Sequence, residues 1–208
     1  MRRASKIVLA VLSFALLSFT ALGQSYPESG GNEVQVWVGG GHSVAGGTSR
    51  TGLANAGLRY GWVLTEPHGP GLLRGRFEYA VDGIPLFLVF QPANTAYGVG
   101  VNPLGLKWDF VPHDRFVPYL ELGGGVLFTT HDVPRGTSSL NFTPGAALGT
   151  HIVTSDLNWS LEIRYMHISN AGLSTPNPGL NSVQVRLGIG AFRNGKQARQ
   201  SRPGNKKP

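Results

Sequence analysis

A two-residue alternation of apolar and polar side chains constrains the fold of this chain more than any other feature. Between residues 157 and 169 the apolar Leu157, Trp159, Leu161, Ile163 and Tyr165 alternate with the polar Asn158, Ser160, Glu162 and Arg164. Successive side chains of a β-strand point to opposite faces, so a strand here has one apolar and one charged face. The same alternation recurs between turns rich in Gly, Pro, Asn and Asp. The sequence therefore predicts an all-β protein.

Eight segments carry this strand pattern. They are residues 33–40, 51–65, 72–82, 96–111, 116–129, 140–153, 157–169 and 181–192. The connections alternate between long (41–50, 83–95, 130–139, 170–180) and short (66–71, 112–115, 154–156). Long loops at one end and short turns at the other are typical of an up-and-down barrel of a bacterial outer membrane. We therefore expect an eight-stranded antiparallel barrel domain over residues 24–192.

The alternation by itself leaves open which face lies inside, and a soluble lipocalin-like barrel with an apolar interior is the alternative. The polar face carries both charge signs, as expected for a narrow lumen filled by paired charges: Arg59, Arg74, Arg76, Glu78, Glu162, Arg164 and Arg186. Aromatic residues lie near the expected strand ends, where an interfacial girdle would form: Trp37, Trp62, Trp108, Phe116, Tyr165 and Phe192. Both observations favour the membrane barrel.

The N-terminal segment has the composition of an export signal. Arg2, Arg3 and Lys6 precede an apolar run, 7–22, that ends in small residues. We expect a signal peptide over residues 1–23 that is cleaved before Gln24, with a single membrane anchor as the alternative. The chain contains no Cys, which excludes lipoprotein attachment, disulfides and thiol redox chemistry.

The formal net charge of +7 comes largely from the C-terminal segment 193–208. Its basic residues are Arg193, Lys196, Arg199, Arg202, Lys206 and Lys207. The segment lacks apolar periodicity and is rich in Gly, Pro, Asn and Gln, so we expect a disordered tail. Contact with an anionic envelope polymer or a lipid head group is the alternative. Because the barrel itself has little excess charge, we expect no nucleic-acid partner.

Cofactor and metal motifs are not found in the sequence. The six His residues (42, 68, 113, 131, 151 and 167) are scattered, without a pair at metal-ligand spacing. The glycine runs 39–41 and 123–125 do not open a helix after a strand, so they fit sharp strand curvature and not a phosphate site. We therefore expect neither a metal nor a cofactor.

His167 and Ser169 stand out because both continue the apolar, outward-facing parity of the segment 157–169. Their Cα atoms would lie about 6.6 Å apart on one face, close enough for an imidazole to serve as general base for a serine nucleophile. The following loop offers amide groups that could bind an oxyanion. Asn181 has the same outward parity and could face His167. A polar strand end in the head-group zone without chemistry is the alternative.

The string His167-Ile168-Ser169-Asn170-Ala171-Gly172, followed by Pro176-Asn177 and Gly179, resembles the signature of the lipid A 3-O-deacylase family of the PagL type, often labelled acyloxyacyl hydrolase. The resemblance implies an outer-membrane barrel whose active site faces the outer-leaflet lipid. It also implies a carboxylic ester hydrolase that removes the ester-linked acyl chain at the 3 position of lipid A. Lipid A, as part of lipopolysaccharide, would then be its partner.

The resemblance also implies roles for individual residues. Ser169 would be the nucleophile and His167 the general base. Asn170, Gly172 and Asn177 match loop positions near this pair, and we expect the Asn177 side chain and the Gly172 N–H to bind the oxyanion and substrate.

Asn181 departs from the family pattern, which has a Glu at this position. An Asn oxygen can accept a hydrogen bond from the imidazole and select its tautomer, but it cannot neutralise the imidazolium. Two hypotheses follow: an esterase of reduced or altered activity, and a non-catalytic barrel of the same descent with a structural or lipid- or protein-binding role.

Overall fold

The computed structural model describes residues 26–154 and 157–193. The expected signal peptide, 1–23, lies outside the described residues, and so does the expected tail apart from Arg193. The boundaries drawn for these two segments therefore stay predictions. Within the described part of the chain, no helix is long and apolar enough to cross a membrane.

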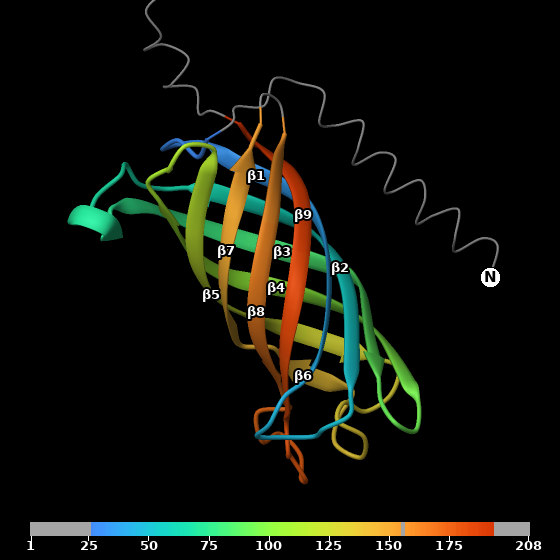
Figure 1. The fold of residues 1–208 in the computed structure, drawn as a ribbon. Helices are drawn as coiled ribbons and strands as arrows, with labels where there is room; N and C mark the ends of the chain where they lie inside the picture. The colour runs from blue at the N-terminus through green and yellow to red at the C-terminus, as the bar shows by residue number, and fades with distance from the viewer. Residues whose placement is uncertain (1–25, 155–156, 194–208) are drawn as a thin grey trace, which may run out of the picture.

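Eight antiparallel strands close into a barrel (Figure 1). They are β1 (Asn32–Ser43), β2 (Gly52–Val63), β3 (Gly75–Phe90), β4 (Thr95–Phe110), β5 (Phe116–Thr129), β7 (Gly145–Val153), β8 (Asn158–Ile168) and β9 (Leu180–Arg193). The short strand β6 (Leu140–Phe142) pairs with β5 near one rim. β9 pairs with β1 and completes the closure, which leaves no open edge along the barrel. The expected eight-stranded antiparallel barrel is confirmed.

The end of β3 differs from the sequence prediction. The strand runs to Phe90, whereas we expected a long loop over residues 83–95. Pro85 lies within this strand, although a proline cannot donate to a strand ladder. The structure accommodates it in a bulge, where the register with β4 shifts between Ile84 and Phe87. The bulge also shifts the parity, so the inward side chains continue with Phe87 and Val89.

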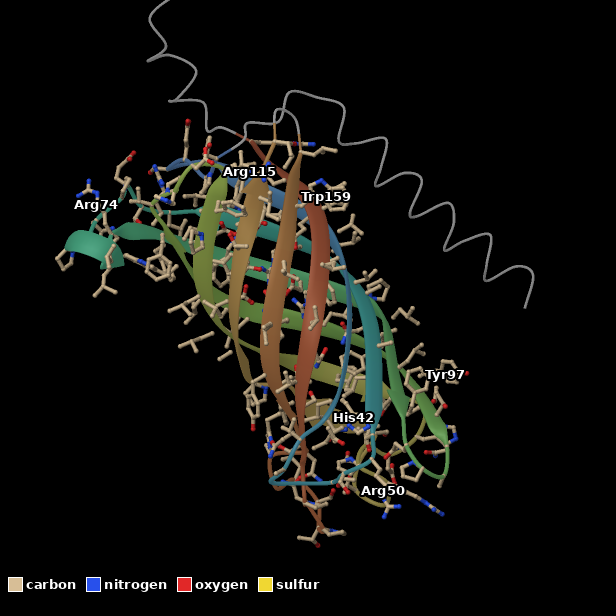
Figure 2. All side chains as sticks on the ribbon, viewed as in Figure 1. His42, Arg50, Arg74, Tyr97, Arg115 and Trp159 are labelled. Atoms are coloured by element: carbon tan, nitrogen blue, oxygen red, sulfur yellow. The ribbon has the colours of Figure 1, made fainter. Side chains whose placement is uncertain are left out.

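The connections follow the expected alternation of lengths only in part. The segment 91–94 between β3 and β4 is short, and the segment 64–74 between β2 and β3 is long enough to hold a 3-10 helix, η2 (Gly71–Leu73). Arg74 is exposed in this turn and does not belong to the lumen, as Figure 2 shows at the end near Arg115. His42 and Arg50 mark the opposite end, where the segments 44–51, 130–139 and 169–179 gather. We call this the external end, by analogy with outer-membrane barrels.

The two faces of the barrel wall are distributed as in a transmembrane barrel. Along β8, Trp159 and Ile163 are exposed, whereas Glu162 and Arg164 are buried inside. β9 repeats the pattern, with Val185 outside and Arg186 inside. A wall that is apolar outside and charged inside suits lipid and excludes the soluble lipocalin-like alternative.

Two of the six aromatic residues expected in an interfacial girdle lie in the lumen. Trp62, Phe116 and Tyr165 are exposed on the wall and Trp108 is partly exposed, but Trp37 and Phe192 are only 1% and 2% exposed. Their inward direction follows the period of two: Trp37 has the parity of the buried Glu33 and Gln35, and Phe192 that of Arg186. Trp37 Nε1 donates a hydrogen bond to Asp82 Oδ1 over 3.1 Å.

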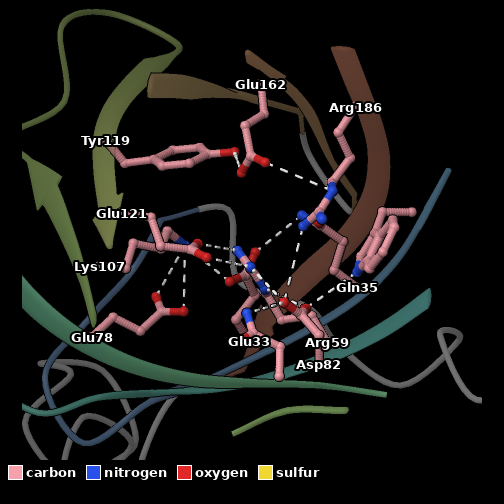
Figure 3. Close-up of polar contacts among 12 residues, drawn as sticks. Glu33, Gln35, Arg59, Glu78, Asp82, Lys107, Tyr119, Glu121, Glu162 and Arg186 are labelled. Atoms are coloured by element: carbon pink, nitrogen blue, oxygen red, sulfur yellow. Dashed lines mark hydrogen bonds and ion pairs between the residues drawn. The ribbon is translucent and has the colours of Figure 1, made fainter. Parts of the chain in front are cut away.

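Paired charges fill the middle of the lumen (Figure 3). Arg59 lies 2.9 Å from Asp82 and 2.7 Å from Glu121. Arg164 lies 2.7 Å from both Glu121 and Glu162. Each of these guanidinium groups thus contacts two carboxylates, which offsets much of the cost of burying charge.

A second group of charges surrounds Lys107, nearer the end of the barrel opposite the external end. Its Nζ lies 2.9 Å from Glu33 and 3.3 Å from both Glu78 and Asp109. His151 is buried beside this group, with Nε2 3.8 Å from Glu33 Oε1. The barrel therefore has a lumen filled by side chains and does not form an open pore.

The external half of the lumen is mainly apolar, apart from buried polar side chains such as the hydrogen-bonded amides of Asn55 and Gln184. A cluster of buried side chains fills it: Trp37, Leu53, Ile84, Phe87, Val89, Ala96, Leu127, Val133, Met166, Ile168 and Leu180. Val133 comes from the loop 130–139 and is fully buried, so this loop closes part of the external end. Met166, Ile168 and Leu180 alternate with the candidate site residues His167, Ser169 and Asn181. The inward packing of these apolar neighbours holds the backbone of the candidate site in place.

Candidate functional site

His167 and Asn181 face each other where β8 and β9 meet the external end. They are directly opposite in the strand register, and His167 Nδ1 lies 2.6 Å from Asn181 Oδ1. An amide oxygen can only accept, so the imidazole donates from Nδ1. The expected facing of these two residues is confirmed. The hydrogen bond leaves Nε2 as the nitrogen that can take up a proton.

Tyr165 joins this pair from the preceding outward position of β8. Its hydroxyl donates to the same Asn181 oxygen over 2.9 Å. From the sequence, Tyr165 is expected on the apolar outward face and in the aromatic girdle, without a role in the site. Its shared parity with His167, two residues along the strand, was the sequence feature that could have indicated the contact.

Ser169 follows the last residue of β8 and is held through its backbone. Its backbone N–H donates to the backbone oxygen of Phe142 over 3.2 Å, and the Phe142 N–H donates to the backbone oxygen of Ser169 over 2.7 Å. β6 therefore anchors the serine at the rim, with the residue 8% exposed. Among the described residues, no hydrogen bond joins the Ser169 and His167 side chains. Such bonds are often long before substrate binds and shorten in the reactive complex.

Asn170 shapes the loop 169–179 through both ends of its amide. Its Oδ1 accepts from the Gly172 N–H over 2.9 Å, and its Nδ2 donates to Ser174 Oγ over 2.8 Å. The Gly172 N–H, expected to bind an oxyanion, is thus already donated within the loop. Gly172 therefore stabilises the conformation of the loop. Its φ of +80° is one that glycine adopts easily.

Asn177 keeps a donor available. Its Oδ1 accepts from the Asn170 N–H over 3.3 Å, which anchors one end of the exposed amide. Its Nδ2 donates no hydrogen bond to the rest of the described chain. The structure therefore brings Asn170, Gly172 and Asn177 into one hydrogen-bonded loop beside Ser169.

The described residues bring no carboxylate into contact with His167. Glu162, the nearest acid along the strand, accepts from Tyr119 and Arg164 inside the lumen. Asp132, in the loop 130–139, accepts a hydrogen bond from Gln91 through its backbone oxygen. Nor does the described chain hold a group of three or more His, Asp or Glu side chains arranged to bind a metal ion. Among the described residues, the group that hydrogen-bonds to the imidazole, the Asn181 amide, is therefore neutral.

Gly179 packs against the imidazole, and its replacement by Ala is expected to displace the ring. A Cβ at this position would lie 2.7 Å from His167 Cε1, and the φ of +67° disfavours any side chain. Because misplacing a catalytic group by about 1 Å can cost about 10²-fold in rate, we expect a comparable loss of any activity that uses His167.

Gly136→Ala is the matched control for Gly179→Ala. Gly136 has a similar φ of +76° but nothing within 4 Å of its added Cβ. Both variants should lose about 1–2 kcal/mol of stability from the left-handed backbone. Turnover assays measure the loss of activity, and unfolding curves measure the loss of stability. Equal activity of the two variants would contradict the contact with His167.

Residues 74–190, more than half of the chain, match the family model described as lipid A 3-O-deacylase (PagL). No curated protein matches.

Two solved structures share the fold. The crystal structure of the outer membrane enzyme PagL has a TM-score of 0.56 and 21% identity, and the match covers 74% of this chain and 97% of that one. The outer membrane protein OprG from Pseudomonas aeruginosa has a TM-score of 0.50 and 13% identity, covering 83% of this chain and 98% of that one. At these identities the two structures support the outer-membrane barrel fold. The family match supports more, and this chain belongs to the lipid A 3-O-deacylase (PagL) family.

Proposed function

We propose that this protein is an outer-membrane esterase that removes an ester-linked acyl chain from lipid A. Ser169 is the nucleophile and His167 the general base in this proposal. The observation that carries it is the hydrogen bond of 2.6 Å from His167 to Asn181, at the lipid-facing external end of a barrel of this family. It orients the imidazole two residues from the serine, on the wall where a lipid would arrive.

The hydrogen bond to Asn181 defines the proton movements. With the Nδ1 proton donated to Asn181, Nε2 takes the Ser169 hydroxyl proton as Oγ bonds to the acyl carbonyl carbon. The carbonyl oxygen becomes an oxyanion, for which Asn177 Nδ2 is the available donor. The ester C–O bond then breaks, and the leaving sugar oxygen takes the proton from Nε2. A water molecule activated in the same way hydrolyses the acyl-serine and releases the fatty acid.

The outer wall supports a substrate that enters from the bilayer. Below His167 and Asn181 the outward side chains of β8 and β9 are apolar and exposed, among them Ile163, Val183 and Val185. The acyl chains of a membrane lipid can lie against such a wall without leaving the apolar phase, so the substrate can reach the site laterally from the bilayer. We accordingly propose that the mature barrel starts after residue 23 and resides in a bacterial outer membrane with the site on its external side.

Asn181 also favours a second candidate, a non-catalytic barrel of the same descent with a structural or binding role. In a serine protease the corresponding Asp→Asn change lowers kcat about 10⁴-fold, chiefly through the wrong imidazole tautomer. The contact between His167 Nδ1 and Asn181 Oδ1 supports an imidazole with its proton on Nδ1, which is the tautomer that the mechanism needs, and this favours the esterase.

Mass spectrometry of lipid A tests the proposal. Expression in a host with fully acylated lipid A should yield a species lacking one 3-hydroxy acyl chain, and His167→Ala should abolish it. Heat-modifiable gel mobility verifies that both barrels are folded. Unchanged lipid A beside the folded parent protein would establish the non-catalytic barrel instead.

A further inference from the structure

We propose that the external loop 44–51, together with Tyr165, holds Asn181 as a neutral orienting group for His167. The groups around position 181 then fit an amide side chain specifically, so the Asn is more than the loss of an acid. The effect on rate rests on the proposed esterase function, whereas the effect on the imidazole does not. Figure 1 shows the loop after β1 reaching the same end of the barrel as the segment between β8 and β9.

All the hydrogen-bonding positions of the Asn181 amide are used. Oδ1 accepts from His167 Nδ1 over 2.6 Å and from the Tyr165 hydroxyl over 2.9 Å. Nδ2 donates to the backbone oxygens of Ala45 over 3.3 Å and Gly46 over 2.8 Å. With the amide 9% exposed, water has little access to replace these partners.

The two backbone oxygens determine which way the amide points. Oxygen and nitrogen of an Asn side chain are assigned from their hydrogen-bond partners. A carbonyl oxygen can only accept, so Nδ2 must face Ala45 and Gly46, and Oδ1 must face His167. The imidazole then has to carry its proton on Nδ1. The backbone of loop 44–51 therefore selects, through Asn181, the tautomer that frees Nε2.

The loop is attached to the start of β9 by its own backbone. The Val44 N–H donates to the backbone oxygen of Asn181 over 2.8 Å, and the Thr48 N–H donates to the backbone oxygen of Gly179 over 3.0 Å. Gly46 has a φ of +96°, and a Cβ there would lie 2.7 Å from Asn181 Nδ2. Only a glycine allows the backbone to approach the amide this closely. The loop thus covers Asn181 as a fixed part of the site.

A carboxylate at position 181 would not fit this loop. An Asp has nearly the same shape as Asn, but it would turn an oxygen toward the Ala45 and Gly46 oxygens and leave both without a donor. Repulsion among these oxygens, at separations of about 3 Å, favours detachment of the loop. Asn181→Asp should therefore weaken the site, although it adds the charge that usually stabilises an imidazolium.

Solution NMR of the uniformly ¹⁵N-labelled barrel in detergent micelles tests the inference, with His167→Gln identifying the His167 signals. In the parent protein, neutral His167 should carry its proton on Nδ1. Asn181→Asp should speed amide hydrogen exchange at Val44 and Thr48 by about tenfold or more, and should lower kcat for deacylation. Unchanged exchange together with a raised kcat, or a parent His167 protonated on Nε2, would overturn the proposal.

Tyr165→Phe provides a second test, because it removes one of the two donors to Asn181 Oδ1 and keeps the aromatic ring. Loss of one hydrogen bond is expected to lower kcat by about three- to tenfold with KM unchanged and to shift the His167 ¹⁵N signals. Tyr97→Phe is the control, since Tyr97 is also exposed on the outer wall and no hydrogen bond of its hydroxyl occurs in the described structure. Equal His167 signals in the Tyr165 variant and the parent would contradict a positioning role.

These measurements separate the inference from the proposed function. If the parent protein leaves lipid A intact, the esterase proposal fails, while the proton position on His167 and the exchange of the loop amides still decide whether Asn181 is held as an oriented amide. If the parent is active but the amides exchange freely, the loop inference alone fails.

Discussion

Replacing Ser169 with Ala is expected to lower kcat for acyl release by about 10⁴-fold or more, with KM nearly unchanged. The substitution removes the oxygen that bonds to the acyl carbon in the proposed mechanism, and it leaves the apolar wall of β8 and β9 in place. Removal of a serine nucleophile costs a large factor because the His167 base then has no hydroxyl to activate. Turnover of purified lipid A by the detergent-solubilised barrel measures this loss.

Ser139→Ala is the control for the Ser169 variant. Ser139 is exposed in the neighbouring external loop, and its hydroxyl has no part in the proposed chemistry. It should keep the parent's kcat, and both variants should unfold at the parent's denaturant concentration. A Ser169→Ala barrel that retains more than about a tenth of the parent's kcat would contradict its role as nucleophile.

Replacing Lys107 with Met is expected to destabilise the barrel by about 3–5 kcal/mol. Lys107 is fully buried, and its ammonium lies within 3.3 Å of carboxylate oxygens of Glu33, Glu78 and Asp109. Removal of the cation leaves three acidic groups close together without the ammonium that balances their charge. Breaking a buried ion pair from one side costs this amount because the remaining charge is uncompensated.

Urea unfolding in lipid vesicles, followed by tryptophan fluorescence, measures the loss at Lys107. Lys107→Arg should be milder because it keeps the charge. Leu106→Met is the control, since Leu106 is the exposed neighbour on the outer wall. If Lys107→Met does not fold, urea unfolding of Lys107→Arg and of Glu78→Gln, which removes one of the surrounding carboxylates, shows whether charge balance is responsible. A loss below about 1 kcal/mol for Lys107→Met would contradict the charged lumen as a source of stability.

Much of the architecture was predictable because alternation is a local property. The two faces of β8 and β9 and the opposition of His167 and Asn181 followed from counting every second residue. The same count would have placed Trp37 and Phe192 inside. Their large aromatic rings near strand ends suggested an interfacial position instead, which was wrong.

The continuation of β3 was not predictable in this way. Pro85 usually ends or excludes a strand, and whether a bulge accommodates it depends on the neighbouring strands. The register shifts opposite β4 supply that accommodation. Likewise, the charge pattern identified Arg59 and Arg164 as lumen residues, but their sharing of Glu121 depends on strands far apart in the sequence.

By itself, the sequence determined the closed barrel, the identity of its two faces and the family motif around Ser169, because each is encoded within a strand or a single loop. Only the tertiary structure shows which hydrogen bonds orient the Asn181 side chain. Its amide is oriented by Ala45 and Gly46, 136 and 135 residues away, which come near only because β9 pairs with β1. Such contacts depend on closure of the barrel, and they leave no periodic trace in the sequence.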